Sequence, residues 1–339
     1  MNKIYNKYTF TALLNLCLCI ISYSQELPIK INGISIVSPP DSIIQNPFEE
    51  IKSLGANWTC IIPYRECKAP NFHIATEDVF SWWGLSITGI ETSIQMAKKS
   101  GLKILLKPQL YLQNSWPGVI NFKTEREWNE WEVEYTQFIL TFLGLAIKHD
   151  VEIFCIGTEI KNSIAERQDY WVELIESMRH IYKGKIVYSA NWDAYENVKF
   201  WNKLDYIGVS SYFPLSEDKN ADVQILKESW MQIVRKLKRF SYRKGMKVLF
   251  TEYGYLSVDH TAYRHWEHED NIYNLAINES AQANALDAFY STWMKESIWA
   301  GGFLWKWYPD RKGHQGYFEK DYTPQGKKAE EVIKKWFAK

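Results

Sequence analysis

The sequence VEIFCIGTEI at residues 151–160 decides the fold, and KVLFTEYGY at residues 247–255 repeats its layout. Each stretch begins with a run of apolar, strand-forming residues and ends on a Thr-Glu pair that includes Glu159 or Glu252. A single carboxylate behind a strand is either a surface charge or a catalytic group, and one stretch alone gives these interpretations equal weight. Two Thr-Glu strand ends in one chain favour a catalytic carboxylate pair.

Strands and helices alternate along the rest of the chain. The predicted strands are Ile31–Val37, Ala56–Pro63, Leu102–Leu106, the run ending at Glu159, Lys185–Ala190, Leu204–Ser211, the run ending at Glu252, and Ala300–Trp307. The predicted helices are Phe48–Leu54, Glu91–Ser100, Glu125–Lys148, Asp169–Tyr182, Ile225–Lys244, Ala281–Trp299 and Lys327–Phe337. This α/β alternation in one domain predicts a single (β/α)8 TIM barrel. A doubly wound open sheet is the alternative, but no Gly-rich phosphate turn follows the first strand.

The composition excludes some classes of partner. The 339 residues include 40 basic and 40 acidic side chains, so the formal net charge is zero and no basic field for nucleic acid is predicted. Aromatic residues are abundant, with 16 Trp, 21 Tyr and 16 Phe. A Trp-rich core is one explanation, but each indole N–H also needs a hydrogen-bond partner. We therefore expect several of these rings in a solvated cleft, where they can stack on sugars.

Residues 1–24 are predicted to be a secretory signal peptide. A basic start precedes an apolar run that is short for a bilayer, and Ser-Tyr-Ser provides a cleavage site before Gln25. Residues 25–339 then form the catalytic domain, and the protein is expected to be secreted or periplasmic. A lipoprotein attached through Cys17 is less favoured, because the residues before it are not small. No transmembrane segment is predicted in the mature chain.

The mature chain keeps three cysteines, Cys60, Cys67 and Cys155, which do not form the pattern of a disulfide scaffold. Cys60 and Cys67 are either a disulfide or two buried thiols, and the second interpretation is favoured. Three histidines follow the seventh predicted strand, and a solvated loop explains them better than a metal site. No zinc spacing, phosphate loop or serine-hydrolase elbow appears, so neither metal nor cofactor is predicted.

The active site of such a barrel lies at the carboxyl ends of its strands. Glu159 and Glu252 end the fourth and seventh strands, separated by three strand–helix units of about 30 residues each. Two carboxyl groups facing each other across a barrel mouth are the arrangement of a glycosidase. Other polar or aromatic residues also end predicted strands, namely Arg65, Gln109, Asn191, Tyr212 and Trp305.

The motifs FCIGTEI, YSANWDAY, LDYIGVSSYFPL, LFTEYGY and GGFLWKW together resemble glycoside hydrolase family 113. The resemblance covers nearly all of the mature chain, and it implies a β-mannanase of the retaining clan that carries its two Glu residues on strands four and seven. By matching position, Glu159 would be the acid/base and Glu252 the nucleophile. Thr158 stands where much of the wider clan has Asn, so the contact to the sugar 2-hydroxyl is left unassigned.

The remaining candidate residues would bind substrate or support the catalytic pair. Arg65 is either a cation that keeps Glu252 ionised or part of a surface salt bridge. Tyr212 either hydrogen-bonds Glu252 or lies on the rim. Trp305 and Trp307 should share one face of their strand under its two-residue period, and one of them should form the floor of the cleaved sugar's subsite. The other predicted substrate contacts are Gln109, Trp116, Asn191, Trp192, Tyr253 and Trp266.

These observations predict a secreted, retaining glycoside hydrolase that cleaves β-1,4-mannosidic linkages in mannan or glucomannan. A related barrel acting on another β-1,4 glycan, such as cellulose or xylan, is the first alternative. A non-catalytic carbohydrate-binding barrel is the second, and the presence of both Glu159 and Glu252 argues against it. The expected partner is a β-linked oligo- or polysaccharide.

Overall fold

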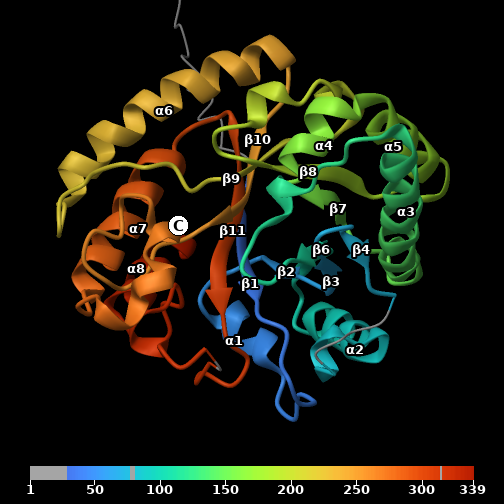
Figure 1. The fold of residues 1–339 in the computed structure, drawn as a ribbon. Helices are drawn as coiled ribbons and strands as arrows, with labels where there is room; N and C mark the ends of the chain where they lie inside the picture. Colours follow the sequence, from blue (N-terminus) through green and yellow to red (C-terminus); the bar gives the residue numbers. More distant parts are fainter. Residues whose placement is uncertain (1–28, 77–80, 314) are drawn as a thin grey trace, which may run out of the picture.

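The computed structural model describes residues 29–76, 81–313 and 315–339, so the predicted signal peptide lies outside the described residues. Eight parallel strands close into a barrel in the order β1-β11-β10-β9-β8-β7-β5-β2 (Figure 1). This confirms the predicted TIM barrel. The barrel strands are β1 (Ile31–Ile36), β2 (Trp58–Ile61), β5 (Lys103–Leu106), β7 (Ile153–Thr158), β8 (Lys185–Asn191), β9 (Ile207–Ser210), β10 (Val248–Tyr253) and β11 (Trp299–Trp307).

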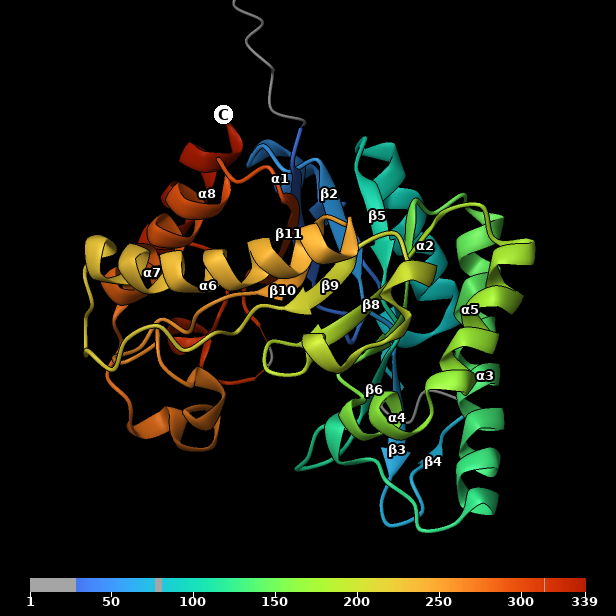
Figure 2. The same ribbon diagram turned by 90° about the horizontal axis from the view of Figure 1, so that it is seen from above.

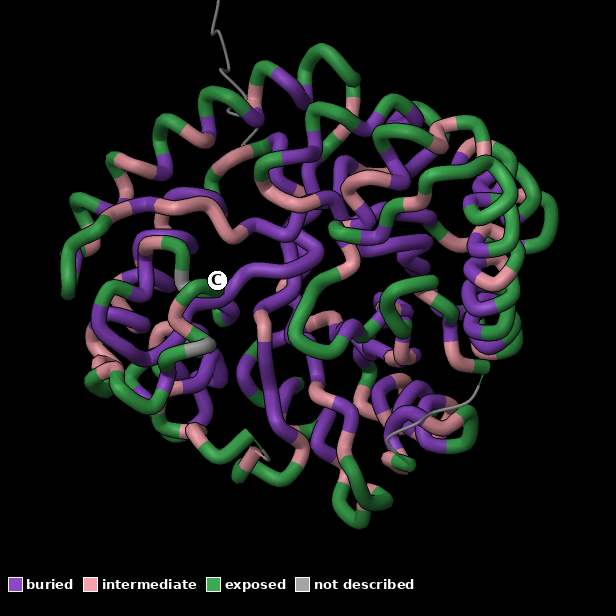
Figure 3. The backbone as a smooth tube through the Cα atoms, viewed as in Figure 1, coloured by how far each residue is buried: buried purple, intermediate pink, exposed green. Residues whose placement is uncertain are grey.

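Helices cover the outside of the barrel, with α2, α3 and α5 on one side and α6, α7 and α8 on the other (Figures 1 and 2). Their buried stripes face the strands and their exposed stripes face outward (Figure 3). The helices are α1 (Pro47–Ser53), α2 (Ile87–Lys99), α3 (Glu125–Lys148), α4 (Lys161–Glu166), α5 (Gln168–Ile181), α6 (Val223–Lys244), α7 (Glu279–Trp293) and α8 (Lys328–Phe337).

Helix α3 shows how local sequence sets these elements. Thr124 caps it by accepting from the backbone N–H of Glu127, whose side chain accepts from the Thr124 backbone in return. Glu125 and Glu127 in the first turn and Lys148 in the last turn match the helix dipole. Both ends lie where the sequence predicts them.

The hydrophobic core has two layers, because successive residues of each strand point to opposite faces. The layer between the strands and the helices is the larger one and contains most of the buried Trp, Tyr and Phe side chains. The barrel interior is filled by a second cluster, which we call the interior cluster: Ile31, Cys60, Ile62, Leu105, Ile153, Cys155, Val187, Leu249 and Phe303. The three described cysteines are free and buried, in agreement with the favoured interpretation.

A small sheet of β3 (Tyr64–Lys68), β4 (His73–Ile74) and β6 (Gln109–Tyr111) extends from the carboxyl ends of β2 and β5. It lies at the end of the barrel opposite the C terminus (Figure 2). The sequence analysis treats these residues as strand ends and loops. The strands are short and partly polar, so the hydrophobic pattern does not reveal them.

Several predicted boundaries differ from the structure by a few residues, and the largest difference is at the end of α7. The helix predicted to reach Trp299 ends at Trp293, and Trp299 is the first residue of β11, paired with Val248 of β10. The intervening residues contain no Gly or Pro to mark the end, so pairing in the barrel determines where the strand begins.

Candidate active site

Glu252 near the end of β10 is held by three side chains from other elements. Its Oε1 accepts from the Lys107 ammonium and from Gln109 Nε2 at 3.1 Å, and its Oε2 accepts from the Tyr212 hydroxyl at 2.9 Å. Lys107 follows β5, Gln109 begins β6 and Tyr212 follows β9. Of the two interpretations of Tyr212, the structure thus shows the hydrogen bond to Glu252, and the carboxylate has one cation and two neutral donors.

The local irregularity of β10 explains how Glu252 reaches the mouth. The pairing of β10 with β9 shifts register between Phe250 and Glu252, as at a bulge, which can redirect a side chain. Thr251 is fully buried, and its hydroxyl lies 2.6 Å from that of Ser189, which lies 3.0 Å from that of Ser210. These three hydroxyls join β8, β9 and β10 inside the barrel beside the carboxylate.

Lys107 is a site residue that the sequence analysis missed. Its side chain is fully buried and forms an ion pair with Glu252. Burial is the largest single effect and lowers the pKa of Lys107, but the charge of Glu252, the hydrogen bond to it and the Cys60 and Cys155 thiols together raise the pKa above its usual value. Lys107 is therefore a charged ammonium at neutral pH, and it supplies the cation that the sequence analysis sought in Arg65.

Arg65 has a structural role in the contacts that the structure shows. Its guanidinium donates to the carbonyls of Tyr64 at 2.8 Å and Leu85 at 3.1 Å, and it lies 5.1 Å from the centre of the Phe142 ring. These contacts tie β3 to the segment before α2 and to α3. At 6% exposure the side chain is buried, which argues against the surface salt bridge.

Glu159 directly follows β7 and has a different environment. Its φ of 57° is left-handed, a rare conformation for a residue other than Gly, and one that is often kept at functional sites. Its N–H donates to the Ser189 carbonyl at 2.8 Å, and the next N–H, of Ile160, donates to the Tyr188 hydroxyl at 2.9 Å. The strained turn is therefore fixed from the neighbouring strand β8.

The pKa of Glu159 is raised to about 7, first by burial and then by the negative charge of Glu252, while the Ser210 hydroxyl and Lys107 act in the opposite sense. The two carboxyl groups are therefore close enough to interact electrostatically. A carboxyl group with a pKa near 7 can give up and take back a proton under ordinary conditions.

Aromatic side chains line the strand ends beside this pair. Trp192 after β8 is half-buried and contacts the rings of Phe213 at 5.7 Å and Trp266 at 5.9 Å, measured between centroids. Half-buried Asn191 ends β8, and Trp116, 36% exposed, lies over Gly118 in the loop after β6. The structure thus shows Gln109 and Tyr212 hydrogen-bonded to Glu252. Substrate contacts of Asn191 and of the candidate tryptophans Trp116, Trp192 and Trp266 remain predictions.

Tyr253 lies on the other face of β10, which corrects its assignment as a substrate contact. It is 1% exposed, its ring stacks on Phe289 of α7 at 4.2 Å, and its hydroxyl lies 3.0 Å from that of Tyr290. Because side chains alternate along a strand, Glu252 faces the mouth and Tyr253 faces the helices.

Trp305 and Trp307 do not share a face, contrary to prediction. In the pairing of β1 with β11, Ser35 faces Trp305 and Ile36 faces Trp307, so Lys306 is skipped at an irregularity. Half-buried Trp305 packs on the interior cluster, whereas Trp307 is fully buried in the outer layer. Trp305 is therefore the candidate floor of a sugar subsite.

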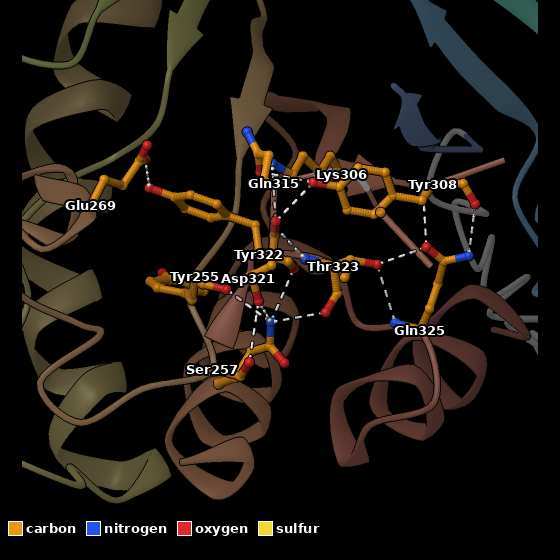
Figure 4. A network of polar contacts seen from close by, with 12 residues as sticks. Tyr255, Ser257, Glu269, Lys306, Tyr308, Gln315, Asp321, Tyr322, Thr323 and Gln325 are labelled. Atoms are coloured by element: carbon orange, nitrogen blue, oxygen red, sulfur yellow. Dashed lines mark hydrogen bonds and ion pairs between the residues drawn. The ribbon is translucent and has the colours of Figure 1, made fainter. Parts of the chain in front are cut away.

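A buried polar network surrounds Lys306, the residue that follows Trp305 in β11 (Figure 4). Lys306, 3% exposed, pairs with Asp321 at 3.3 Å and donates to Gln315 at 2.6 Å. Asp321 also accepts from the Tyr308 hydroxyl at 2.8 Å. Burial lowers the pKa of Lys306, and the carboxylate of Asp321 opposes that effect.

The same network reaches the residues around Glu252. The Lys306 ammonium lies 5.4 Å from the Trp305 ring centre and 5.8 Å from that of Tyr322. Tyr322 donates to Glu269 at 2.7 Å, and its ring lies 6.5 Å from that of Tyr212, the Glu252 donor. Segments far apart in sequence thereby hold one side of the mouth in place.

In the part of the chain that the structure describes, no three His, Cys, Asp or Glu side chains are grouped so that they could hold a metal ion. None of the described helices is long and apolar enough to span a bilayer.

The family model of Glycoside Hydrolase Family 113 matches residues 45–327, which is most of the chain. The chain belongs to Glycoside Hydrolase Family 113. It is thus a glycoside hydrolase, and the expected positions of the acid/base and the nucleophile in this family 113 barrel are Glu159 and Glu252. A comparison with curated proteins finds no match.

Solved structures share the fold of this family 113 chain. A GH113 β-mannanase from Alicyclobacillus acidocaldarius in complex with ManMIm superposes with a TM-score of 0.77 at 22% identity, covering 91% of this chain and 97% of that one. A second GH113 β-1,4-mannanase gives 0.75 at 23% identity, covering 91% and 99%. A family 5 mannosidase from Rhizomucor miehei gives 0.64 at 8% identity, covering 92% and 94%.

Proposed function

We propose that this family 113 glycoside hydrolase is a retaining endo-β-1,4-mannanase that acts on mannan or glucomannan. The observation that carries the proposal is the contrast between two neighbouring carboxyl groups. Glu252 is paired with a buried ammonium, whereas Glu159 has a pKa of about 7. A carboxylate paired with a cation beside a second carboxyl group with a raised pKa is the arrangement of one nucleophile and one acid/base.

In the first step a Glu252 oxygen attacks the anomeric carbon and forms a glycosyl ester. The bond to the leaving sugar breaks, its electron pair stays on the glycosidic oxygen, and the proton of Glu159 is transferred to that oxygen. Lys107, Gln109 and Tyr212 position the nucleophile through their contacts with its two oxygens.

In the second step Glu159, now ionised, removes a proton from water. The water oxygen attacks the anomeric carbon, the ester bond to Glu252 breaks, and both carboxyl groups return to their starting states. Two displacements at one carbon give a product with the configuration of the substrate. A pKa of about 7 suits a group that acts as acid in one step and base in the next.

The choice of mannan is supported by the family and by the fold shared with two GH113 β-mannanases. A reducing-sugar assay on mannan, glucomannan, cellulose and xylan tests this choice, with the Glu252→Ala variant as the blank. We expect release of reducing ends from the first two polymers. Faster cleavage of cellulose or xylan would assign another β-1,4 glycan, and glycan binding without any cleavage would indicate a binding barrel.

We propose, on the pattern of residues 1–24, that the protein is exported and that Gln25 begins the mature chain. N-terminal sequencing of protein recovered outside the cytoplasm should begin at Gln25. A sequence that still begins at Met1, or a lipid on Cys17, would contradict this proposal.

A further inference from the structure

A cavity opens on the loops that follow β1 and β2, at the end of the barrel that carries Glu159 and Glu252. Its volume is about 630 Å³, within the range of ligand-binding sites. It contains none of the residues that contact Glu252 in the structure. Its lining includes Asp41 and Ser42 after β1, Arg65 of β3, and Trp82, Trp83 and Ser86 before α2.

The small sheet connects this cavity to the catalytic site. Gln109 donates to Glu252, and it is paired with Tyr64 across the β3–β6 ladder. Arg65, the next residue of β3, lines the cavity. Because side chains alternate along β3, Arg65 faces Leu85 and α3, on the other face of the strand from Tyr64. The loops that line the cavity leave the barrel at the same end as Glu252.

Backbone contacts fix the segment that carries the two tryptophans. The N–H of Trp83 donates to the Pro40 carbonyl at 2.8 Å, and that of Gly84 donates to the Pro39 carbonyl at 2.9 Å. The Ser86 hydroxyl donates to the Trp83 carbonyl at 2.6 Å. Arg65 holds the same segment from β3 through the Leu85 carbonyl at 3.1 Å.

Gly89 shows how closely this segment is packed, because a Cβ there would lie 1.9 Å from the Trp83 carbonyl oxygen. The backbone of Trp82 and Trp83 is consequently held in place, and both side chains are half-buried. Such preorganisation lowers the entropic cost of binding.

The chemistry of the lining favours a neutral sugar over an anion. An indole ring offers a flat apolar surface to the C–H face of a sugar, and Asp41, Ser42 and Ser86 offer hydrogen-bonding groups to its hydroxyls. Arg65 is engaged with two carbonyls and the Phe142 ring, and exposed Asp41 adds a negative charge that would repel an anionic ligand.

We infer that this cavity is a distal subsite that holds sugar units of a long β-mannan chain while its scissile bond lies between Glu159 and Glu252. The inference rests on the proposed function and adds to it a contact that only long substrates can make. Short oligosaccharides that fill the catalytic mouth alone would not reach Trp83.

The test compares kcat/KM for mannohexaose and mannotriose in the wild type, Trp83→Ala and Trp83→Phe. We expect Trp83→Ala to lower the hexaose-to-triose ratio by about tenfold, as for loss of a central aromatic contact. Trp83→Phe should restore most of the ratio. Tyr242→Ala, which removes a 65%-exposed ring on α6, is the matched control and should keep the wild-type ratio.

An unchanged ratio in Trp83→Ala would overturn the inference while leaving the proposed function intact. Failure of the wild type to cleave either substrate would instead overturn the proposed function. In that event, the subsite is tested by calorimetric titration with mannohexaose. The titration compares the affinity of Glu252→Ala with that of the double variant that also has Trp83→Ala. Weaker binding after Trp83→Ala would support the subsite, and equal affinities would refute it.

Discussion

The carboxyl ends of β7 and β10 carry the same Thr-Glu pair but place it in opposite electrostatic environments. At β10, Glu252 accepts from a buried ammonium and two neutral donors. At β7, Glu159 sits in a left-handed turn, where burial and the Glu252 charge raise its pKa to about 7. The same Thr-Glu pair therefore yields different chemistry, because the neighbouring strands supply different partners.

The comparison also shows how the two environments depend on each other. The charge on Glu252, stabilised by Lys107, is the largest cause after burial that raises the pKa of Glu159. A substitution at the end of β10 that removes this charge should therefore lower the pKa of Glu159 at the end of β7. The following variants separate the two strand ends, beginning with the largest expected effect.

Glu252→Ala should lower kcat on mannan by at least about 10⁴-fold, because no glycosyl ester can form. With an activated aryl mannoside, added azide should replace the missing carboxylate and give the α-azide. Glu228→Ala, on the outer helix α6, is the control for the loss of a carboxylate and should retain activity. A β-azide from Glu252→Ala would mean that the roles of the two Glu residues are reversed.

Glu159→Ala should lower kcat on mannan by about 10²- to 10⁴-fold, because the leaving oxygen is no longer protonated. An activated aryl glycoside leaves without that proton, so the first step should be much less affected. Azide should then release the glycosyl enzyme as the β-azide, which proton NMR identifies. Equal losses on mannan and on the aryl glycoside would refute the acid/base assignment.

Lys107→Met should lower kcat by about 10²-fold, the scale of losing one preorganised electrostatic contact. It should also destabilise the fold, since removing one partner leaves the other charge of a buried pair without compensation. Urea unfolding of Lys107→Met, Glu252→Gln and the double variant measures the coupling. Additive changes in the free energy of unfolding would show that the ion pair has no energetic role.

Lys306→Met is a matched control for Lys107→Met, because both remove a buried ammonium near the mouth. Lys306 pairs with Asp321 behind Trp305 and not with a proposed catalytic group. We expect a loss of stability with a smaller loss of kcat. An equal fall in kcat would mean that the wall around Trp305 matters to catalysis as much as the nucleophile's own cation.

The pH dependence of activity and of stability should reflect the raised pKa of Glu159 at the end of β7. Glu159 must carry a proton in the first step, so kcat/KM should fall as pH rises through about 7. Its raised pKa also stabilises the folded state. This contribution is fully present below pH 4.5, the usual pKa of a glutamate, and it is lost as pH rises to about 7. The loss amounts to about 3 kcal/mol, at about 1.4 kcal/mol for each unit of pKa.

Glu159→Gln cannot ionise, so it should not show that loss. Its free energy of unfolding should exceed that of the wild type by more at about pH 9 than at about pH 4. Chemical denaturation at both values measures the difference. A constant difference would show that the pKa of Glu159 is not raised in the folded protein.

The barrel and both carboxylates could be predicted from the sequence, because buried parallel strands are continuous apolar runs and catalytic groups lie at their carboxyl ends. Lys107 could not be assigned a role, since its contact with Glu252 joins β5 to β10 across the barrel. Trp307 was misplaced because the face on which a side chain lies depends on strand irregularities, which pairing reveals and sequence does not. Tyr253 was misplaced although the two-residue period of a strand puts it opposite Glu252.

The most direct test of the account is the anomeric configuration of the first product. Proton NMR can follow hydrolysis of mannohexaose by enough enzyme to outrun mutarotation. A nucleophile at Glu252 and an acid/base at Glu159 require two displacements at one carbon, so the new reducing end should appear first as the β-anomer. Initial appearance of the α-anomer would mean a single displacement by water and would contradict the roles assigned to both residues.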